Sequence, residues 1–189
     1  MVKEQRNFWM RWRVRTGYPV AVIYWILAAP TPVSILLGGL VAAAGLLIRG
    51  AASGHLRKYE ELVTSGPYAR TRNPLYFGSA FLAVGFALAG HSWWAGGIVV
   101  GYFAVFYSAV MRNEERDLRT RYGAAFDEYA SRVRLFFPRI SSAPEFQSTG
   151  KAFDFAQYRR NREYKALLGT LAGIGIVWVR MWIRRRFGF

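Results

Sequence analysis

The sequence contains no cysteine, only two histidines, and 11 acidic residues against 26 lysines and arginines. The absence of cysteine excludes disulfide bridges, thiolate nucleophiles and cysteine-ligated metal sites. The two histidines, His55 and His91, are isolated from each other, so we expect no metal site and interpret each as a polar loop residue. The hydrophobic fraction of 53% is too high for a collagen-like or disordered chain.

Charged residues are missing from two long stretches of the chain. No Asp, Glu, Lys or Arg occurs in residues 17–48 or 73–111, which are runs of 32 and 39 residues. A soluble domain would have to bury both runs completely, whereas a lipid bilayer accepts uninterrupted apolar helices of about 20 residues. The sequence of 189 residues therefore predicts a single all-α, polytopic membrane domain.

Each apolar run is divided by residues that interrupt helices. Pro30-Thr31-Pro32 divides the first run and Gly90-His91-Ser92 divides the second. We interpret the runs as two transmembrane helical hairpins, 17–48 and 75–111, with the first helix beginning inside the basic, interfacial stretch 1–16. A signal peptide is the alternative for the N-terminus, but a proline beside the expected cleavage point and the second apolar helix that follows at once argue against it.

The distribution of basic residues predicts the orientation of these hairpins. Residues 1–16 carry 5 lysines and arginines, residues 49–72 carry 5 and residues 112–165 carry 12, whereas the two hairpin turns carry none. We therefore expect a multi-pass integral membrane protein with its N-terminus and all three basic segments on the cytoplasmic side.

A fifth apolar helix is predicted at 166–186, after a polar tail at 139–165. Gly169 and Gly173 would give it a small-residue face for packing on another helix, and we expect the same of Gly97 and Gly101 in the fourth helix. We expect residues 166–186 to span the bilayer. A helix lying in the interface is the alternative, because a spanning helix would carry its terminal arginines away from the cytoplasm.

The segments on either side of the second hairpin are expected to be neighbours, because a hairpin returns the chain to the face that it left. The first segment, residues 66–78, reads Gly-Pro-Tyr-Ala-Arg-Thr-Arg-Asn-Pro-Leu-Tyr-Phe-Gly. Asn73-Pro74 predicts an extended residue before a helix whose free N–H groups can bind an anion. The alternative is an ordinary helix start beside interfacial arginines.

The second segment, residues 112–138, begins with a carboxylate at the end of an apolar stripe. Spacings of 4, 4, 4, 3 and 4 residues separate Glu114, Leu118, Tyr122, Phe126, Tyr129 and Val133. These spacings predict one face of a single helix, unless Gly123 breaks it. A carboxylate in this position requires a cation, which is either a nearby arginine such as Arg72 or a cationic ligand.

The order of these motifs resembles the isoprenylcysteine carboxyl methyltransferase family. The shared pattern is Gly-Pro-Tyr, Arg-Asn-Pro-Leu-Tyr-Phe-Gly, a two-helix hairpin, then Glu-Glu with Leu, Tyr-Gly, Phe and Tyr, ending near Arg-Pro. It covers about residues 59–138 of a methyltransferase-like core, 49–138, and the integral-membrane phospholipid N-methyltransferases share the organisation. The resemblance implies an S-adenosylmethionine-dependent methyltransferase with a cytoplasmic cofactor-binding cap and a lipophilic acceptor that enters from the bilayer.

The resemblance also implies roles for individual residues. It implies that seven residues line the cofactor pocket: Tyr68, Arg72, Asn73, Pro74, Tyr76, Glu114 and Glu115. Of these, Glu114 and Glu115 would lie at the charged end of the cofactor. The candidate catalytic residues are Glu114 and Arg134: an arginine could hold a carboxylate acceptor by two parallel hydrogen bonds, and a carboxylate could help to deprotonate an amine acceptor. Asn73 and Phe126 depart from the family pattern, in which histidine and tyrosine are frequent at these positions.

Three other functions remain open at this level. The acceptor could be a phosphatidylethanolamine-like amine, the chain could be a sterol-reductase-like protein that binds NADPH, or it could be a non-catalytic basic scaffold on anionic lipid. We expect no nucleic-acid partner, since no aromatic and basic platform accompanies the positive charge.

Overall fold

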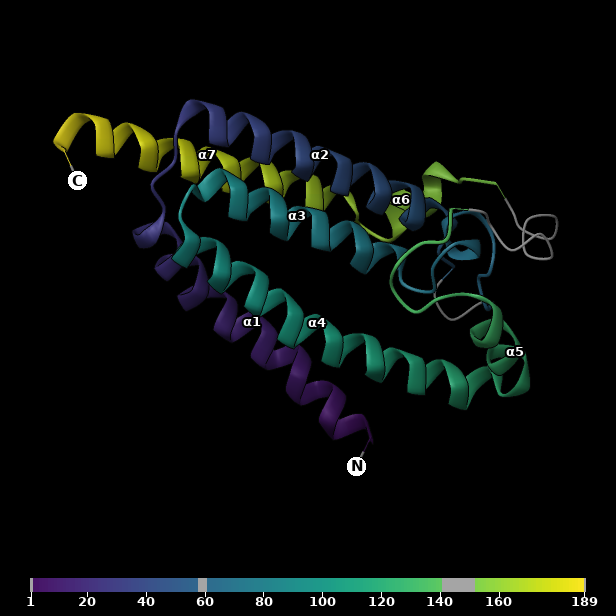
Figure 1. Ribbon diagram of the computed structural model, residues 1–189. Helices are drawn as coiled ribbons and strands as arrows, with labels where there is room; N and C mark the ends of the chain where they lie inside the picture. Colours follow the sequence, from purple (N-terminus) through teal and green to yellow (C-terminus); the bar gives the residue numbers. More distant parts are fainter. Residues whose placement is uncertain (1, 58–60, 141–151, 189) are drawn as a thin grey trace. The chain divides into compact units, whose positions relative to one another are not determined.

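The computed structural model of the chain describes residues 2–57, 61–140 and 152–188, with side chains at Trp12 and from Arg15 onward. Every regular element in these residues is helical, as the sequence predicted (Figure 1). The elements are α1 (Val2–Leu27), α2 (Pro32–His55), the 3₁₀ helix η1 (Gly66–Ala69), α3 (Pro74–Gly90), α4 (Trp93–Tyr122), α5 (Ala124–Arg132), α6 (Phe155–Arg160) and α7 (Tyr164–Phe187).

Three of these helices are long and apolar enough to cross a membrane, namely α2, α4 and α7. Helix α3 is also apolar but has only 17 residues. The predicted apolar helix at 166–186 is confirmed as α7. The orientation of the N-terminus stays a prediction, as does the number of transmembrane hairpins.

The chain turns where the sequence predicted, but its helices extend further. Helix α3 ends at Gly90, and His91 adopts a left-handed φ of 46°. Helix α2 continues past Ile48 to His55, and α4 continues past Met111 to Tyr122. The loss of apolar character at these points does not end a helix, because no proline follows and the arginines and glutamates that continue α4 favour helix.

The tail that we predicted as polar, residues 139–165, contains a further helix, α6. Its N-cap is Asp154, whose carboxylate accepts a hydrogen bond of 2.8 Å from the backbone N–H of Ala156. Residues 141–151 of this tail lie outside the described residues, as do Met1 of the basic N-terminal stretch and residues 58–60 of the predicted methyltransferase-like core, 49–138.

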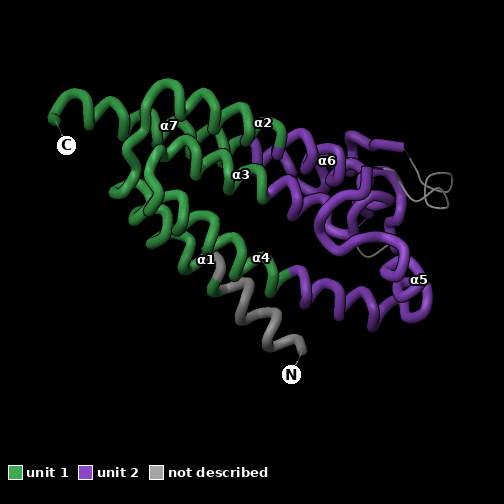
Figure 2. Tube along the Cα trace, in the orientation of Figure 1, with its two compact units in different colours: residues 1–44, 80–110, 168–189 green, residues 45–79, 111–167 purple. Residues whose placement is uncertain are grey.

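The helices divide between two compact units (Figure 2). Unit 1 comprises residues 1–44, 80–110 and 168–189, and unit 2 comprises residues 45–79 and 111–167. Helices α2, α3, α4 and α7 each contribute residues to both units. Unit 2 contains every residue that the sequence assigned to the candidate site.

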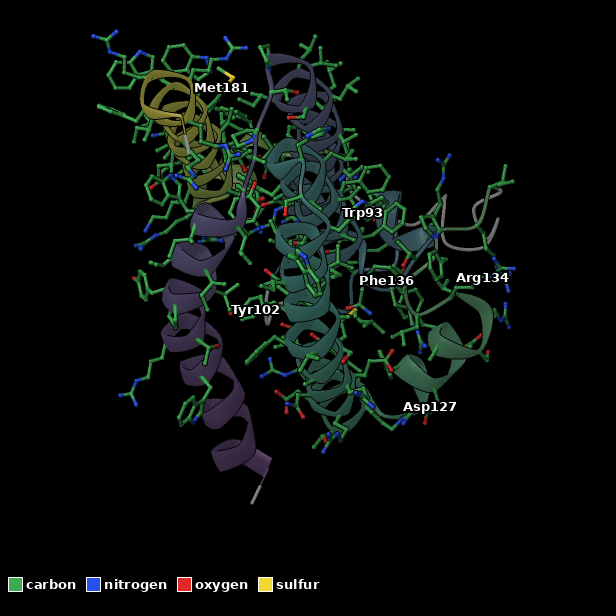
Figure 3. The ribbon with its side chains drawn as sticks, turned by 60° about the vertical axis from the view of Figure 1, so that its left-hand side comes forward. Trp93, Tyr102, Asp127, Arg134, Phe136 and Met181 are labelled. Carbon is green, nitrogen blue, oxygen red and sulfur yellow. The ribbon has the colours of Figure 1, made fainter. Side chains whose placement is uncertain are left out.

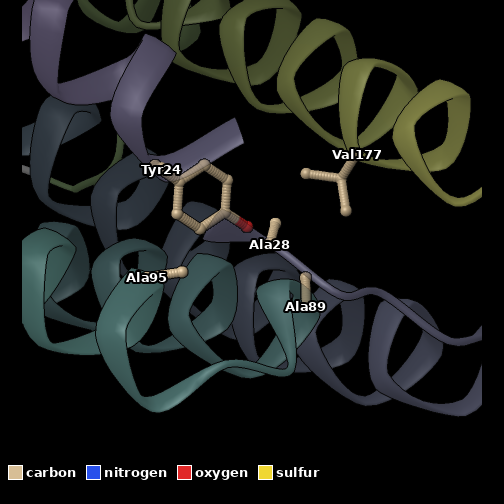
Figure 4. Close-up of a cluster of buried hydrophobic side chains, with 5 residues drawn as sticks. All are labelled: Tyr24, Ala28, Ala89, Ala95 and Val177. Atoms are coloured by element: carbon tan, nitrogen blue, oxygen red, sulfur yellow. The ribbon is translucent and has the colours of Figure 1, made fainter. Parts of the chain in front are cut away.

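The core of unit 1 is made largely of small side chains. Its buried cluster joins Tyr24 and Ala28 of α1 to Ala89 of α3, Ala95 of α4 and Val177 of α7 (Figure 4). The Tyr24 hydroxyl in this cluster donates a hydrogen bond of 2.8 Å to a backbone carbonyl of α3. The alanines allow four helices to approach one another closely, as is common for packed helices in membranes.

Glycines bring α2 and α3 into direct backbone contact in unit 1. A Cβ atom placed on Gly85 would lie 2.6 Å from the carbonyl oxygen of Gly38, so neither helix could move closer or carry a side chain there. In α7, a Cβ atom on Gly173 would lie 2.6 Å from the ring of Phe86, whereas nothing lies within 4 Å of the same position on Gly169.

The small-residue face predicted for α4 is wrong. Nothing lies within 4 Å of a Cβ atom placed on Gly97 or Gly101. Ala95 and Val99 pack against the core instead. Gly97 is two residues from Ala95, so it lies about 200° away around the helix, on the opposite side.

Candidate active site

The loop between η1 and α3 is held in place by the chain that follows α5. The backbone N–H of Arg72 donates a hydrogen bond of 2.9 Å to the carbonyl oxygen of Arg134. The Thr71 hydroxyl donates a bond of 2.9 Å to the carbonyl oxygen of Phe136. Residues 70–73 and 134–139 therefore lie side by side, and the predicted proximity of the two segments is confirmed within unit 2.

Asn73 and Pro74 fix the start of α3. The buried Asn73 side chain donates a hydrogen bond of 3.0 Å from Nδ2 to the carbonyl oxygen of Leu135. The Asn73 carbonyl accepts a bond of 2.9 Å from the N–H of Phe77, and Pro74 is the first residue of the helix, where its missing N–H has no cost. One of the two side-chain N–H groups of Asn73 is thus already used within the fold.

Tyr68 is also buried and supports the same loop. The Tyr129 hydroxyl on α5 donates a hydrogen bond of 2.7 Å to the backbone carbonyl of Tyr68. Burial raises the pKa of both tyrosines above the ordinary value. Both phenols therefore stay protonated at neutral pH, and Tyr129 remains a hydrogen-bond donor.

The apolar stripe after Glu114 does not form one continuous helix. Helix α4 ends at Tyr122, and Gly123, with a φ of 51°, starts a new direction before α5. Glycine adopts this left-handed conformation without the steric cost that a Cβ atom brings. The prediction of a single helix is wrong because of this glycine. Even so, the stripe residues of both helices gather in one cluster around buried Phe126.

Four of the predicted site residues meet as two polar pairs. The Tyr76 hydroxyl of α3 donates a hydrogen bond of 2.7 Å to Oε1 of Glu114 on α4. Arg72 Nη1 lies 3.0 Å from Oε1 of Glu115, and the two side chains are only 14% and 21% exposed. Glu114 itself is exposed, and Arg72, which the sequence offered as its cation, pairs with the neighbouring Glu115.

The Arg72–Glu115 pair leaves hydrogen-bonding capacity unused. Within the described part of the chain, Arg72 Nε and Glu115 Oε1 are buried and have no partner in hydrogen-bond geometry, although the ion pair is short. Buried polar atoms without partners are uncommon in folded proteins, and Arg72 Nε could still donate to a further acceptor.

Arg134 is placed differently from the other candidates. Its carbonyl oxygen receives the bond from Arg72, but its side chain is exposed (Figure 3). The structure therefore brings the Arg134 backbone, rather than its guanidinium group, to the polar pairs. Its predicted role as a clamp for the acceptor stays a prediction.

A pocket of about 660 Å³ lies on another side of the same loop. We call it the Arg70 pocket, and its lining residues are Ile48, Ala51, Gly66, Pro67, Arg70, Thr71, Pro74, Phe77 and Pro138. Among the site residues that the sequence predicted, Pro74 alone lines it. The sequence reasoning missed Ile48 and Ala51 because we placed the end of the helix at Ile48.

A buried ion pair that the sequence analysis did not predict holds the C-terminal tail to this unit. Arg49 Nε and Nη2 donate to the two carboxylate oxygens of Glu163 at 2.6 and 3.1 Å, and the side chains are 19% and 9% exposed. Arg49 Nη1 also donates to the Ser79 hydroxyl. The position of Arg49, directly after the first charge-free run, was the only signal in the sequence.

The tail also caps the end of α2. The Asn161 side chain donates hydrogen bonds of 2.9 and 2.8 Å to the carbonyl oxygens of Ser53 and Leu56. These carbonyls lie in the last turn of α2 and just beyond it, where no intrahelical partner exists. The tail is therefore part of the structure that supports the Arg70 pocket wall.

The described residues form a helical fold with three helices long enough and apolar enough to cross a membrane. Unit 2 holds the two polar pairs, next to the loop between η1 and α3. Residues 33–125 match the family model described as phospholipid methyltransferase, a family related to the isoprenylcysteine carboxyl methyltransferases. This match confirms the resemblance that the motifs indicated. The matched segment contains both polar pairs.

Two curated relatives carry names that concern metal resistance. The chain is 41% identical over 122 residues to the nickel-cobalt-cadmium resistance protein NccN of Alcaligenes xylosoxydans xylosoxydans, covering 62% of this chain and 54% of the relative. It is 40% identical over 85 residues to the cobalt-zinc-cadmium resistance protein CzcN of Cupriavidus metallidurans, covering 45% of this chain and 39% of the relative. The chain thus spans about half or less of each relative's length.

No solved structure matches the chain. Within the residues that the structure describes, no group of three or more His, Asp or Glu side chains is arranged to hold a metal ion. The metal-related names therefore remain statements about the two relatives.

Proposed function

We propose that the protein is an S-adenosylmethionine-dependent methyltransferase of the membrane that acts on a lipophilic, isoprenoid- or lipid-like acceptor. The observation that carries this proposal is the meeting of Tyr76 with Glu114 and of Arg72 with Glu115 inside the matched family segment. These residues come from the loop, the first turn of α3 and the polar end of α4. The two pairs place charged groups for binding a ligand, and they do not form a set of metal ligands.

The unused atoms of the Arg72–Glu115 pair suit the charged end of S-adenosylmethionine. That end carries an ammonium group and a carboxylate, so it needs an acceptor of negative character and a cationic donor close together. Glu115 Oε1 is buried and lies 3.0 Å from Arg72 Nη1 without hydrogen-bond geometry, and the buried Arg72 Nε has no hydrogen-bond partner among the described residues. Charge-assisted hydrogen bonds to a zwitterion would satisfy both atoms.

The Tyr76–Glu114 pair would supply the second part of the donor site. S-adenosylmethionine provides a methyl group bound to a positively charged sulfur, which leaves as the neutral thioether once the acceptor takes the methyl group. A carboxylate and an aromatic ring are both favourable neighbours for this positive charge. The hydrogen bond from Tyr76 holds the Glu114 carboxylate in a defined position, and methyl transfer depends mainly on such positioning.

Carboxyl O-methylation of a prenylcysteine-like acceptor is the first specific reaction that we propose. A carboxylate is already a nucleophile at neutral pH: its oxygen bonds to the methyl carbon, the carbon–sulfur bond breaks, and no proton has to leave. The protein then needs only to hold the acceptor in line with the donor, and Arg134 remains our candidate for a contact to the carboxylate.

Phospholipid N-methylation is a second candidate, and the description of the matching family model favours it. Here a phosphatidylethanolamine-type amine is the nucleophile, and its proton must be removed before or during transfer. Glu114 is exposed and lies beside the proposed donor site, so it is available as the base. Transfer of a labelled methyl group into extracted lipid, compared with transfer to an added prenylcysteine, separates the two reactions.

The first experiment tests the donor site itself. We would titrate the purified protein in lipid nanodiscs with S-adenosylhomocysteine, using NADPH as the comparison ligand. Glu115→Gln and Tyr76→Phe are each expected to weaken S-adenosylhomocysteine binding by about tenfold, because each removes one charge-assisted hydrogen bond or its support. The matched control is Glu128→Gln, which changes an exposed glutamate of α5 in the same way.

The alternatives have different outcomes in this experiment. Binding of NADPH without binding of S-adenosylhomocysteine would favour the reductase-like function. Failure of the folded protein to bind either compound would favour the non-catalytic scaffold. Equal weakening by Glu128→Gln would refute the assignment of the site.

A further inference from the structure

Helix α7 ends in a group of arginines that belongs to unit 1. We call it the α7 arginine cluster, and its members are Arg180, Arg184, Arg185 and Arg186. Just before them, Val177 packs in the same buried cluster as Ala28 and Ala89, where α1 ends and α3 turns into α4 (Figure 4). Helix α7 then continues for about 15 Å beyond Val177, at 1.5 Å per residue. The arginines therefore lie at the end of unit 1 that holds these turns.

Unit 1 has almost no negative charge with which to balance this cluster. None of the four arginines forms an ion pair among the residues that the structure describes. The chain has no Asp or Glu in residues 17–48, 73–111 or 166–189. The one acidic residue of unit 1, Glu4, lies near the start of α1, about 33 Å along that helix from Ile26.

The helix ends offset only a small part of the positive charge. Helices α1, α3 and α7 end on this side of unit 1, and α2 and α4 begin there. Each helix end carries about half an elementary charge, negative at the C-terminus and positive at the N-terminus, so together they supply about half a negative charge. Against four guanidinium groups, a charge of about +3.5 is left to attract anions from outside the protein.

Arg180 reaches back to the end of α1. Its Nη2 donates a hydrogen bond of 2.8 Å to the carbonyl oxygen of Ile26, and its guanidinium carbon lies 4.9 Å from the centre of the Trp25 ring. Within the described chain, Arg180 Nε is buried and has no hydrogen-bond partner. An arginine side chain carries five N–H donors, so the fold leaves most of this guanidinium group for an acceptor from outside.

Arg184 lies on the same face of α7 as Arg180. Residues that are four positions apart on a helix differ by about 40° around its axis. The buried residues Val177 and Met181 mark this face as the one that packs on the core of unit 1. Arg184 is half-buried beside it, whereas the two arginines that follow are exposed. The first two arginines of the cluster thus form a pair, one turn apart, next to the end of α1.

The side chains around this pair fit the interface of a bilayer. Trp178, Trp182 and Phe187 of α7 are 55%, 54% and 62% exposed. Exposed aromatic residues near the end of an apolar helix are typical of the level of the lipid headgroups. At that level the available anions are phosphate groups of lipids, and a phosphate accepts two parallel hydrogen bonds from a guanidinium group.

We propose that Arg180 and Arg184 form a binding site for the headgroup of an anionic phospholipid, with Arg185 and Arg186 adding to the local positive charge. The lipid phosphate accepts hydrogen bonds from the pair, and the acyl chains lie along the exposed apolar side chains of α7. The site belongs to unit 1 and is independent of the proposed methyltransferase activity. It gives the terminal arginines a counter-charge on whichever side of the membrane they lie.

The test uses a fluorophore on Phe187→Cys, one turn beyond Arg184, in a chain that has no other cysteine. The labelled full-length protein is placed in phosphatidylcholine nanodiscs that contain spin-labelled phosphatidylglycerol or spin-labelled phosphatidylcholine with the same acyl chains. Quenching as a function of the spin-labelled fraction gives the preference for the anionic lipid. An arginine near an anionic lipid surface contributes about fivefold, so we expect a preference of about 25-fold from the pair.

Two variants locate the preference at the pair. Arg184→Gln should lower it to about fivefold, and this variant leaves the bond from Arg180 to α1 in place. Arg180→Gln/Arg184→Gln should lower it to about one. The matched control is Arg112→Gln/Arg116→Gln, which removes the same charge at the same spacing from exposed positions of α4 in unit 2 and should leave the preference unchanged.

Each result decides one part of the proposal. Equal quenching by the two lipids in the unsubstituted cluster would overturn it. An unchanged preference in Arg184→Gln, or an equal loss in Arg112→Gln/Arg116→Gln, would overturn the location of the site. Glycerophosphoglycerol, the same headgroup without acyl chains, is added as a competitor at the concentration of the lipid. Relief of quenching by this soluble compound would make the ligand a free phosphodiester and would overturn the assignment to a lipid.

Discussion

Removal of the Glu163 carboxylate should destabilise the protein far more than its position in a polar tail suggests. In Glu163→Gln, the Arg49 guanidinium keeps its charge but loses its anionic partner, because glutamine offers one neutral amide oxygen in place of two carboxylate oxygens. The bonds from Arg49 to the Ser79 hydroxyl and to the carbonyl oxygen of Leu75 remain. Breaking a buried ion pair from one side costs about 3–5 kcal/mol. Because Arg49 and Glu163 are 19% and 9% exposed and Arg49 keeps its bonds to Ser79 and Leu75, we expect the lower end, about 3 kcal/mol.

The measurement is thermal unfolding of the detergent-solubilised protein, followed by circular dichroism. For a chain of this size, about 3 kcal/mol corresponds to a fall in Tm of roughly 6–12 °C. Glu128→Gln is the matched control, since it breaks an exposed ion pair with Arg132 in which the side chains are 63% and 43% exposed. We expect that control to lose only about 0.3–0.5 kcal/mol.

A double substitution distinguishes loss of the ion pair from loss of packing. Arg49→Met with Glu163→Leu removes both charges and keeps similar volumes, so much of the lost stability should return. A Tm for Glu163→Gln that equals that of Glu128→Gln would refute the reasoning, because Arg49 would then be solvated without its partner. A double variant less stable than Glu163→Gln would show that the polar contacts, rather than an unpaired charge, determine the cost.

Three further predictions concern packing, the site loop and topology. Gly85→Leu should strongly lower the Tm because its side chain would collide with the α2 backbone, whereas Gly97→Leu, with open space around it, should not; equal effects would contradict the described packing. Tyr129→Phe should cost about 1 kcal/mol in urea unfolding, because it leaves a backbone carbonyl of η1 without its donor; an unchanged midpoint would contradict that bond. Because the chain has no cysteine, the single variants Arg116→Cys and His91→Cys can each be labelled at one position. In intact cells, a membrane-impermeant maleimide should label His91→Cys and not Arg116→Cys; labelling of Arg116→Cys would reverse the predicted orientation.

The helical class and the positions of the turns could be predicted from local features of the sequence. Charge-free runs indicate membrane helices whatever their neighbours are, and Pro30 to Pro32 and Gly90 interrupt helices by their own backbone chemistry. The helix ends were harder to predict. The charged residues after Met111 end the apolar run, but they also favour helix. Helix α4 therefore continues for eleven residues beyond Met111.

The candidate site was predicted in part. The order of motifs identified Tyr76, Glu114, Arg72 and Glu115, and the structure pairs them across segments that lie 38 and 43 positions apart in the sequence. The individual pairing was not predictable, because adjacent glutamates point about 100° apart on a helix and only the rotation of α4 decides which one meets Arg72.

Residue type and spacing were enough to predict an all-helical fold with apolar helices of membrane-spanning length and a methyltransferase-type order of motifs. Two contacts could be read only from the folded chain: Glu163 meets Arg49 across 114 positions, and Pro74 lines the Arg70 pocket while Tyr76 bonds to Glu114. Such contacts depend on how helices rotate and pack against one another. Local propensity and hydrophobic period do not specify that rotation. It is set by the balance of packing, desolvation and ion pairing over the whole unit.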